Sequence, residues 1–255
     1  MINILLHGAG GRMGRAIADI VKAKENMRVI CGVDIAATGE FDFPVFTDFS
    51  DVPEDTEIDV IIDFSHFTAV PGVVSFAKKR GIPAVIATTG LSEEQLADVK
   101  ALSSRVAVFR SANMSVGISL LKQLVCEAAD FLGDGFDIEI VERHHNQKLD
   151  APSGTALAIA DAINESENNK FKYVYERRSV RQKREKNEIR ISAVRGGNIV
   201  GDHDVLFAGN NEIIEINHRA LSRGIFAEGA VKAAEYLITK GPGMYDMDML
   251  VKERK

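Results

Sequence analysis

The sequence has little cysteine and no long apolar run. Its two cysteines, Cys31 and Cys126, lie in apolar segments without the spacing of metal ligands or redox pairs, which argues against a disulfide framework. We expect both thiols to be reduced and buried. No apolar stretch is long enough to span a bilayer, and Met1–Leu6 runs into a glycine turn without a basic signal-like region. These absences predict a cytoplasmic protein without a membrane partner.

The sequence also lacks an excess of positive charge. It has 31 Lys and Arg against 37 Asp and Glu among 255 residues, a formal net charge of −6. Such a chain has no overall field to attract nucleic acid, so an anionic ligand must be met by local positive groups. The charge balance therefore argues against a nucleic-acid partner. Hydrophobic residues make up 45% of the chain, enough for the cores of two modest domains.

Short apolar runs alternate with helical patterns in the first half of the chain. We expect strands at Ile2–Leu6, Val29–Val33, Val60–Asp63, Ala84–Ala87 and Val106–Phe109, and helices at Met13–Ala23, Val70–Lys79 and Glu93–Leu102. This alternation predicts an α/β domain of the Rossmann type, a doubly wound parallel sheet with right-handed crossovers.

The alternation of strands and helices ends after Asn113, where the expected strands follow one another with few helices between them. We expect helices at Gly117–Phe131 and Thr155–Ile163 and strands at Asp137–Glu142, Ile189–Val194, Val205–Phe207 and Ile213–Asn217. This order predicts a second, α+β domain with a mixed or antiparallel sheet. A helical pattern at Phe226–Ile238 ends before a Gly-Pro-Gly stop signal, and we expect it to return to the first domain.

A polar segment at 165–187 carries a basic run, Arg177–Lys186, with six Lys and Arg side chains. Such a run suits either an anion-binding arm or a solvated loop, and the solvated loop is the favoured interpretation.

The first strand leads directly into a glycine-rich turn of the type that binds dinucleotides. Gly8 permits the tight turn, Gly10 lets the backbone approach a pyrophosphate, and Gly14 allows close packing of helix and strand. Arg12 adds a positive charge, and Asp34 ends the next strand at the distance expected for a ribose contact. The expected cofactor-binding residues of the turn are Gly8, Ala9, Gly10, Gly11, Arg12, Met13, Gly14 and Asp34. They predict a pyrophosphate on the N-terminal amides of the following helix.

Two further loops follow expected parallel strands, where ligands gather in such sheets. They are Thr88–Gly90 and Ser111–Met114. Either loop, taken alone, could equally be a simple turn.

The most informative segment is Glu142–Ala156, which reads E-R-H-H-N-Q-K-L-D-A-P-S-G-T-A. His144, His145 and Lys148 bring a proton donor and positive charge into one short segment, which suits an anionic substrate. The helix that begins at Ser153-Gly154-Thr155 has a capping serine and offers free amides to a carboxylate. The alternatives are a solvated loop and a zinc site, but adjacent histidines point in different directions and no further ligand completes a metal set. We therefore expect no metal.

This string resembles the signature of the 4-hydroxy-tetrahydrodipicolinate (dihydrodipicolinate) reductase family, and G-A-G-G-R-M-G at 8–14 resembles that family's nucleotide turn. The resemblance extends over essentially the whole chain. It includes D-F-S at Asp63–Ser65, T-T-G at Thr88–Gly90, A-N-M-S-V-G at Ala112–Gly117, R-G-G-x-I-V-G at Arg195–Gly201 and the tail from Phe226.

The resemblance implies a reductase of lysine and diaminopimelate biosynthesis that uses NADH or NADPH to convert 4-hydroxy-tetrahydrodipicolinate into tetrahydrodipicolinate, with loss of water. It implies a dinucleotide-binding domain at 1–114 and 225–255, a substrate-binding and oligomerisation domain at 115–224, and a homotetramer. By motif, His144 and Lys148 resemble the catalytic donors. The residues that resemble the contacts to a small dicarboxylate substrate are His145, Ser153, Gly154 and Thr155, and those around the nicotinamide are Ala87, Thr88, Thr89, Ser111, Ala112, Asn113 and Met114.

The sequence departs from a common family pattern at Ile35 and His66, where members that use NADPH often have arginine. NADH is therefore expected to serve at least as well as NADPH. The competing hypotheses are another two-domain reductase of a small carboxylate, and a nucleotide-sensing regulator that binds nucleic acid through Arg177–Lys186. The first has no need of the H-H-x-x-K-x-D-A-P-S-G-T string, and the second has no need of His144 and Lys148.

Overall fold

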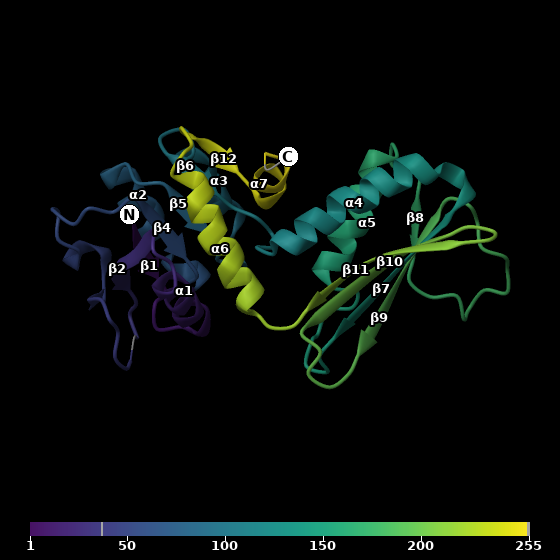
Figure 1. The fold of residues 1–255 in the computed structure, drawn as a ribbon, viewed down its shortest axis with the longest axis horizontal. Coiled ribbons are helices and arrows are strands. Elements are labelled where there is room, and N and C mark those ends of the chain that lie inside the picture. The colour runs from purple at the N-terminus through teal and green to yellow at the C-terminus, as the bar shows by residue number, and fades with distance from the viewer. Residues whose placement is uncertain (37, 254–255) are drawn as a thin grey trace. The chain divides into compact units, whose positions relative to one another are not determined.

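The computed structural model describes residues 1–36 and 38–253, and it divides the chain into two compact units (Figure 1). The first unit contains residues 1–116 and the C-terminal segment from Gly224 on, and the second contains residues 117–223. The second unit is thus inserted into the first. No helix within the described ranges has the length and apolar character needed to cross a membrane.

The first unit is built on a parallel seven-stranded sheet with the order β12-β6-β5-β4-β1-β2-β3. Its strands are β1 (Ile2–His7), β2 (Met27–Val33), β3 (Val45–Phe46), β4 (Val60–Asp63), β5 (Ala84–Ile86), β6 (Ala107–Phe109) and β12 (Gly243–Tyr245). Its helices are α1 (Arg12–Lys22), α2 (Val70–Arg80), α3 (Glu93–Leu102), α6 (Gly224–Leu237) and α7 (Met247–Lys252), with 3-10 turns at Phe49–Asp51 and Phe67–Ala69. The predicted Rossmann-type parallel sheet is confirmed.

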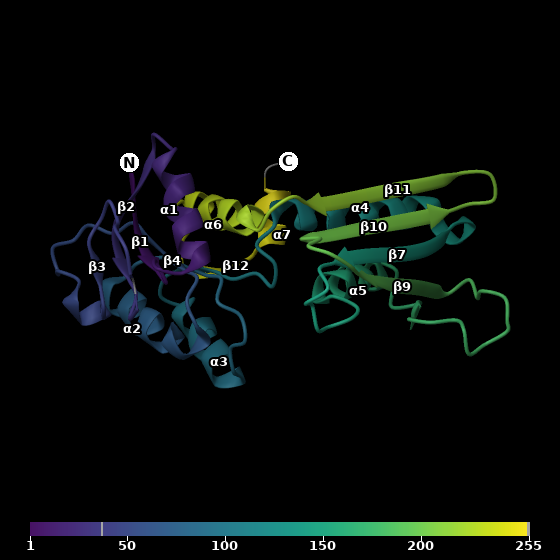
Figure 2. The same cartoon turned by 90° about the horizontal axis from the view of Figure 1, so that it is seen from below.

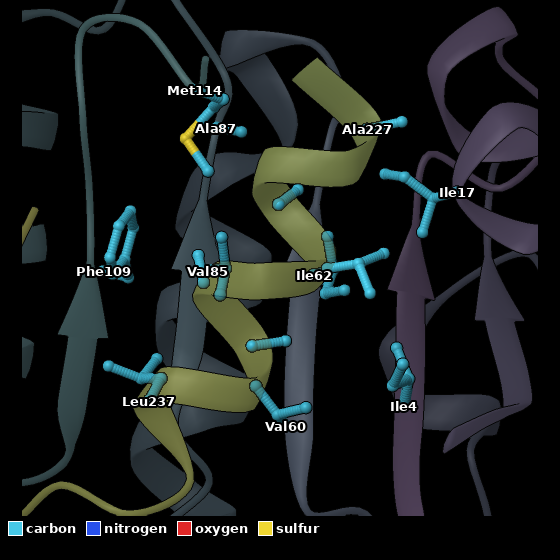
Figure 3. Packing of buried hydrophobic residues seen from close by; sticks show 14 of the residues in the cluster. Ile4, Ile17, Val60, Ile62, Val85, Ala87, Phe109, Met114, Ala227 and Leu237 are labelled. Carbon is cyan, nitrogen blue, oxygen red and sulfur yellow. The ribbon is translucent and has the colours of Figure 1, made fainter. Parts of the chain in front are cut away.

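Both faces of this sheet are buried, because successive side chains of a strand point to opposite sides. Ile4 and Leu6 of β1 lie in the core cluster that contains α1 and α6, whereas Leu5 between them lies in the cluster that contains α2 and α3. Figure 3 shows the first cluster, in which side chains of α6 such as Ala227 and Leu237 meet those of the central strands.

Helix α6 approaches the end of the first chain segment closely enough to require glycine. A Cβ at Gly229 would lie 1.7 Å from the carbonyl oxygen of Met114, a distance that no side chain can tolerate. Met114 itself is buried in the same core cluster as α6. The backbone of Met114 thus packs directly against α6, although the two segments are more than a hundred residues apart in the sequence.

The second unit is a mixed five-stranded sheet with the order β11-β10-β7-β9-β8, covered on one face by two helices. Its strands are β7 (Asp137–His144), β8 (Lys172–Val174), β9 (Glu188–Arg195), β10 (Gly201–Ala208) and β11 (Ile213–Ala220); its helices are α4 (Val116–Leu132) and α5 (Gly154–Ser166), with a 3-10 turn at Gly133–Gly135. Strand β10 pairs antiparallel with β7 and β11, while β7 and β8 pair parallel with β9. Figure 2 shows these strands in front of α4 and α5. The predicted α+β character is confirmed.

Four short elements were not predicted, namely β3, β8, β12 and α7. Strands of two or three residues contain no readable alternation of apolar and polar side chains, and they form because a neighbouring strand offers hydrogen bonds. Strand β7 also runs two residues further than expected, to His144. The polar residues at the end of β7 are typical of a loop in the sequence, but each residue from Ile138 to His144 pairs with β9.

Neither cysteine forms a disulfide, and the two differ in burial. Cys31 is buried as expected, and burial raises its pKa to about 11. Cys126 is only partly buried on α4, so the expectation of full burial is wrong for this residue.

The interpretation of the basic run as a solvated loop is wrong for two of its arginines. Arg184 has a side chain that is 17% exposed; it donates to Asp137 at 2.9 Å, to Glu139 at 3.1 Å and to the carbonyl oxygen of Ile138 at 3.1 Å. Arg177 pairs with the buried Glu188 at the start of β9. These guanidinium groups fold back onto the beginnings of β7 and β9. A count of charges along the sequence does not reveal the carboxylates and the carbonyl that bind them there.

Replacing Arg184 by methionine is therefore expected to lower the free energy of unfolding by about 1–3 kcal/mol, because it removes the guanidinium donor from Glu139 and from the carbonyl of Ile138 at the start of β7. Lys183, an exposed neighbour in the same run, provides the matched control, and Lys183→Met is expected to change stability by less than about 0.5 kcal/mol. Urea denaturation followed by circular dichroism measures both values. Equal effects of the two substitutions would show that Arg184 contributes only as a surface charge.

Candidate active site

The glycine turn between β1 and α1 has the geometry expected of a dinucleotide loop. Gly8 adopts a positive φ of 79°, and a Cβ there would lie 2.6 Å from the carbonyl oxygen of Phe64. A Cβ at Gly14 would lie 2.2 Å from the carbonyl oxygen of Gly8, so Gly14 allows α1 to pack closely against the turn that follows β1. Helix α1 begins at Arg12 after Gly11, with no side-chain cap and no acidic residue in its first turn. The N-terminus of α1 is therefore suited to an anion.

Asp34 connects this turn with the end of β2. Its Oδ2 accepts from the amide of Gly10 at 2.9 Å and its Oδ1 accepts from the amide of Ala36 at 2.9 Å. Because each carboxylate oxygen has a second acceptor site, Asp34 can still bind hydroxyl groups. It lines an open cavity of about 310 Å³ together with Ile35, Phe41 and other residues, and Ile35 is 88% exposed.

The remaining residues expected near the cofactor are not equally accessible. Ala9, Ala87 and Met114 are buried in the core. Thr88 is also buried, and its hydroxyl donates to Asp63 at 2.7 Å. The others are exposed or half-buried: Gly10, Gly11, Arg12, Met13, Thr89, Ser111, Ala112 and Asn113.

In the second unit, His144 lies at the end of β7 beside a buried carboxylate. Its Nδ1 is 2.6 Å from Oε2 of Glu142, and Glu142 is 0% exposed. The two side chains share a face of the sheet because they are two residues apart on one strand. Glu142 also accepts from Nη1 and Nη2 of Arg195 at 2.7 and 2.8 Å and from the amide of Ser153 at 2.9 Å. Arg195 reaches it because His144 pairs with Arg195 across β7 and β9.

The charge of Glu142 determines which nitrogen of His144 carries a proton. Burial opposes ionisation of Glu142, but hydrogen bonds from Arg195, His144 and Ser153 outweigh burial and lower the pKa of the carboxyl group. An ionised Glu142 requires a donor at Nδ1 of His144, which leaves Nε2 to exchange a proton with a ligand. A Cβ at Gly201 would lie 3.0 Å from this Nε2, so the glycine leaves room beside it.

His203 of β10 completes this group from the other side. Its ring lies 5.2 Å from that of His144 in an edge-on arrangement, and its Nε2 is 3.2 Å from Oγ of Ser153. Burial, and then the charge of His144, lowers the pKa of His203 to about 4. His203 is therefore uncharged near neutral pH.

Ser153 caps α5, and the expected start of this helix is confirmed. Its Oγ accepts from the amide of Ala156 at 3.1 Å, so the amides of Gly154 and Thr155 occupy the first turn of α5, where the helix dipole favours a carboxylate. His145, one residue beyond β7, is half-buried.

Lys148 joins the same group through Asp150. Its Nζ is 2.8 Å from Oδ1 of Asp150, and this hydrogen bond lowers the pKa of Asp150. The carbonyl oxygen of Asp150 accepts from Nη2 of Arg195 at 2.6 Å. Arg195 therefore links the segment that carries Lys148 to the buried Glu142.

The structure thus brings together His144, Lys148 and the start of α5, and it adds three residues that the sequence interpretation missed: Glu142, Arg195 and His203. A signal for two of them was present, since Glu142 begins the longer string E-R-H-H-N-Q-K and Arg195 begins R-G-G-x-I-V-G. Among residues 1–36 and 38–253 no group of three or more His, Cys, Asp and Glu side chains is arranged to hold a metal ion.

Comparisons with known proteins identify the family. Two protein-family models match the sequence. The family described as dihydrodipicolinate reductase, N-terminus, matches residues 2–114, and the family described as dihydrodipicolinate reductase, C-terminus, matches residues 117–251. The 4-hydroxy-tetrahydrodipicolinate reductase of Caldanaerobacter subterraneus subsp. tengcongensis is 54% identical over 253 residues, 99% of either chain. That of Clostridium tetani is 45% identical, over 98% of this chain and 97% of the relative.

The fold has a counterpart among solved structures. The dihydrodipicolinate reductase of Paenisporosarcina sp. TG-14 superposes with a TM-score of 0.79 at 24% identity, over 96% of this chain and 97% of that one. With the full-length relatives and both family matches, the chain belongs to the 4-hydroxy-tetrahydrodipicolinate reductase family, the NAD(P)H-dependent oxidoreductases of lysine and diaminopimelate biosynthesis.

Proposed function

We propose that His144 is the proton donor in the family's reaction, the reduction of 4-hydroxy-tetrahydrodipicolinate to tetrahydrodipicolinate with loss of water. The observation that carries this role is the position of Nδ1 of His144, 2.6 Å from Oε2 of the fully buried Glu142. When bound, a reduced nicotinamide supplies the hydride. The 4-hydroxyl group leaves as water to give the conjugated ring. Hydride addition to that ring would leave negative charge on a neighbouring carbon, and a doubly protonated His144 would deliver the proton on Nε2 that quenches it.

The substrate carboxylates are held by the groups around His144. Lys148 supplies a compact positive charge, and the amides of Gly154 and Thr155 supply donors at the start of α5. His145 and Ser153 complete the expected contacts. The solved relative is described as bound to dipicolinate, a planar dicarboxylate, which supports this class of ligand. Fixing the ring against the acid is an orientation effect that can contribute up to about 7–11 kcal/mol.

The dinucleotide binds to the first unit in this proposal. Its pyrophosphate lies on the N-terminal amides of α1, the adenosine ribose on Asp34, and the nicotinamide beside the loops at Ala87–Thr89 and Ser111–Met114. The uncapped N-terminus of α1 and the cavity beside Asp34 support these assignments.

The proposed activity is tested by incubating the full-length chain with enzymatically generated substrate and following the oxidation of NADH and NADPH by absorbance. Substrate-dependent oxidation of either cofactor, inhibited by dipicolinate, is the expected result. Oxidation only with a different small carboxylate would assign the chain to another reaction on the same fold.

NADH is expected to equal or exceed NADPH in kcat/KM, because the 2′-phosphate of NADPH would approach the carboxylate of Asp34 while Ile35 offers no guanidinium. Asp34→Ala is expected to shift the ratio toward NADPH. Asp34→Asn, which removes the charge but keeps an acceptor for the amide of Gly10, separates repulsion from loss of the turn. A preference of the wild type for NADPH by about 10-fold, or 1.4 kcal/mol, would mean that another cation, such as Arg12, binds the phosphate.

A cytoplasmic homotetramer completes the proposal, with the second unit as the assembly domain. The face of its sheet that α4 and α5 leave open bears large exposed apolar side chains, including Val194 and Ile213, and such patches are typical of interfaces. Light scattering is expected to give the mass of four chains, and a monomer would contradict this part of the proposal.

A further inference from the structure

A buried carboxylate that the proposed chemistry does not use lies in the first unit. Asp63, the last residue of β4, is 0% exposed. Its Oδ1 is 2.8 Å from Nδ1 of His7 and accepts from Oγ of Ser65 at 2.6 Å. Its Oδ2 accepts from Oγ1 of Thr88 at 2.7 Å. A carboxylate removed from water in this way depends on these donors.

The donors come from the carboxyl ends of three neighbouring strands. His7 ends β1, Ser65 follows β4, and Thr88 follows β5. Backbone hydrogen bonds strengthen the connection, since the amide of Phe64 donates to the carbonyl of His7 at 3.1 Å. Asp63 therefore connects the glycine turn with the loops at 64–66 and 87–90.

The glycine turn is in direct contact with this network. Gly8 follows His7 in the chain. A Cβ added at Gly8 would lie 2.6 Å from the carbonyl oxygen of Phe64, so there is no space between the glycine turn and the loop at 64–66. Any shift of the loop at 64–66 must therefore move the turn. His7 has no other evident task, because it is buried and its ring packs on Phe49 with centroids 4.9 Å apart.

We propose that His7 is a positioning residue for dinucleotide binding: through Asp63 it holds the glycine turn and the loops at Ser65 and Thr88 in the arrangement that the cofactor requires. This inference rests on the proposed binding of NADH or NADPH to the first unit. His7 does not touch the cofactor and acts only on the backbone around it.

The test compares three variants of the full-length chain. His7→Ala removes the donor to Asp63. His7→Asn retains a donor close to the position of Nδ1. Asn3→Ala is the matched control, because Asn3 is similarly buried on the same strand and accepts a side-chain hydrogen bond from Arg28 at the opposite end of the sheet. Titration with NADH, followed by nicotinamide fluorescence, gives Kd, and steady-state rates give KM and kcat.

His7→Ala is expected to raise Kd and KM for NADH about 10-fold while changing kcat by less than about 3-fold, the range set by losing one hydrogen bond to a buried charge. His7→Asn is expected to restore Kd to within about 3-fold, and Asn3→Ala to lower the melting temperature without changing Kd. Ser65→Ala removes the hydroxyl that donates to Oδ1 of Asp63 at 2.6 Å and, should His7→Ala not fold, is expected to raise Kd in the same direction.

An unchanged Kd in His7→Ala would overturn the inference, as would an equal increase of Kd in Asn3→Ala, which would indicate general destabilisation. Either result leaves the proposed function standing as long as the wild type binds and oxidises NADH. A wild type that binds neither dinucleotide would instead overturn the proposed function.

Discussion

His144→Gln is expected to lower kcat by at least about 100-fold while leaving the Kd for NADH within about twofold, because the variant loses the acid but not the dinucleotide site. Glutamine has no proton to deliver near neutral pH, whereas a doubly protonated His144 can release the proton on Nε2 while Nδ1 still donates to Glu142. Steady-state kinetics with saturating substrate, together with fluorescence titration of NADH, measures both quantities.

His144→Asn serves as the matched variant for this test. Its amide can still donate to Glu142 from about the position of Nδ1, so the free energy of unfolding is expected to stay closer to that of the wild type, yet it has no equivalent of Nε2. Both variants should therefore be inactive while differing in stability. Near-normal turnover in His144→Asn would remove His144 from proton transfer and leave it a structural role.

Arg195→Leu is expected to have the largest effect on stability, a loss of about 3–5 kcal/mol in the free energy of unfolding. It removes both Nη donors from Glu142, which is 0% exposed. Because His144 depends on Glu142 for its orientation, kcat is expected to fall as well. Lys172→Leu is the control, since Lys172 of β8 pairs with Glu185 while both side chains are exposed (68% and 51%), and its loss should change stability by less than about 1 kcal/mol.

The pH dependence of the free energy of unfolding tests whether Arg195 controls the charge of Glu142 in addition to donating hydrogen bonds to it. In the wild type the pKa of Glu142 is lowered below its usual 4.5, so its contribution is present above that value and is lost as the pH falls through the folded-state pKa. Without Arg195, burial dominates and raises the pKa of Glu142, so stability should instead decrease as the pH rises past the usual value. Urea denaturation over this range checks the sign. If the free energy of unfolding of Arg195→Leu depends on acidic pH in the same way as that of the wild type, Arg195 does not control the charge of Glu142.

The sequence predicted those elements whose ends are set locally. Strand β4 and helix α3 begin and end where expected; α3 has a capping box in which Ser92 and Gln95 bond reciprocally, and such signals lie within four residues of one another. Strands β3 and β12 were missed because each has too few residues to show a pattern and forms at a sheet edge set by its neighbour.

The candidate site likewise has a part that the local sequence predicts and a part that depends on strands distant in the sequence. The string from His144 to Thr155 placed the proton donor, the lysine and the helix start in one segment, because local order along the chain brings them together. The partnership of Glu142 with Arg195 spans 53 residues and depends on the register of β7 against β9, which no local pattern contains. For the same reason the sequence did not distinguish Arg184, which folds back onto β7, from its exposed neighbour Lys183.

The discontinuity of the first unit has a consequence for its synthesis on the ribosome. Residues 117–223 form a continuous unit, so they can complete their own core as soon as β11 has emerged. The sheet of the first unit cannot, because one of its faces is covered by α6, whose Ala227, Val231 and Leu237 lie in the same cluster as Ile4 and Ile62. The part of that apolar face that α6 covers stays open until residues beyond 237 have been made. The part of the chain synthesised first is thus the last to become fully folded, and during that interval its exposed strands are the region most prone to aggregation.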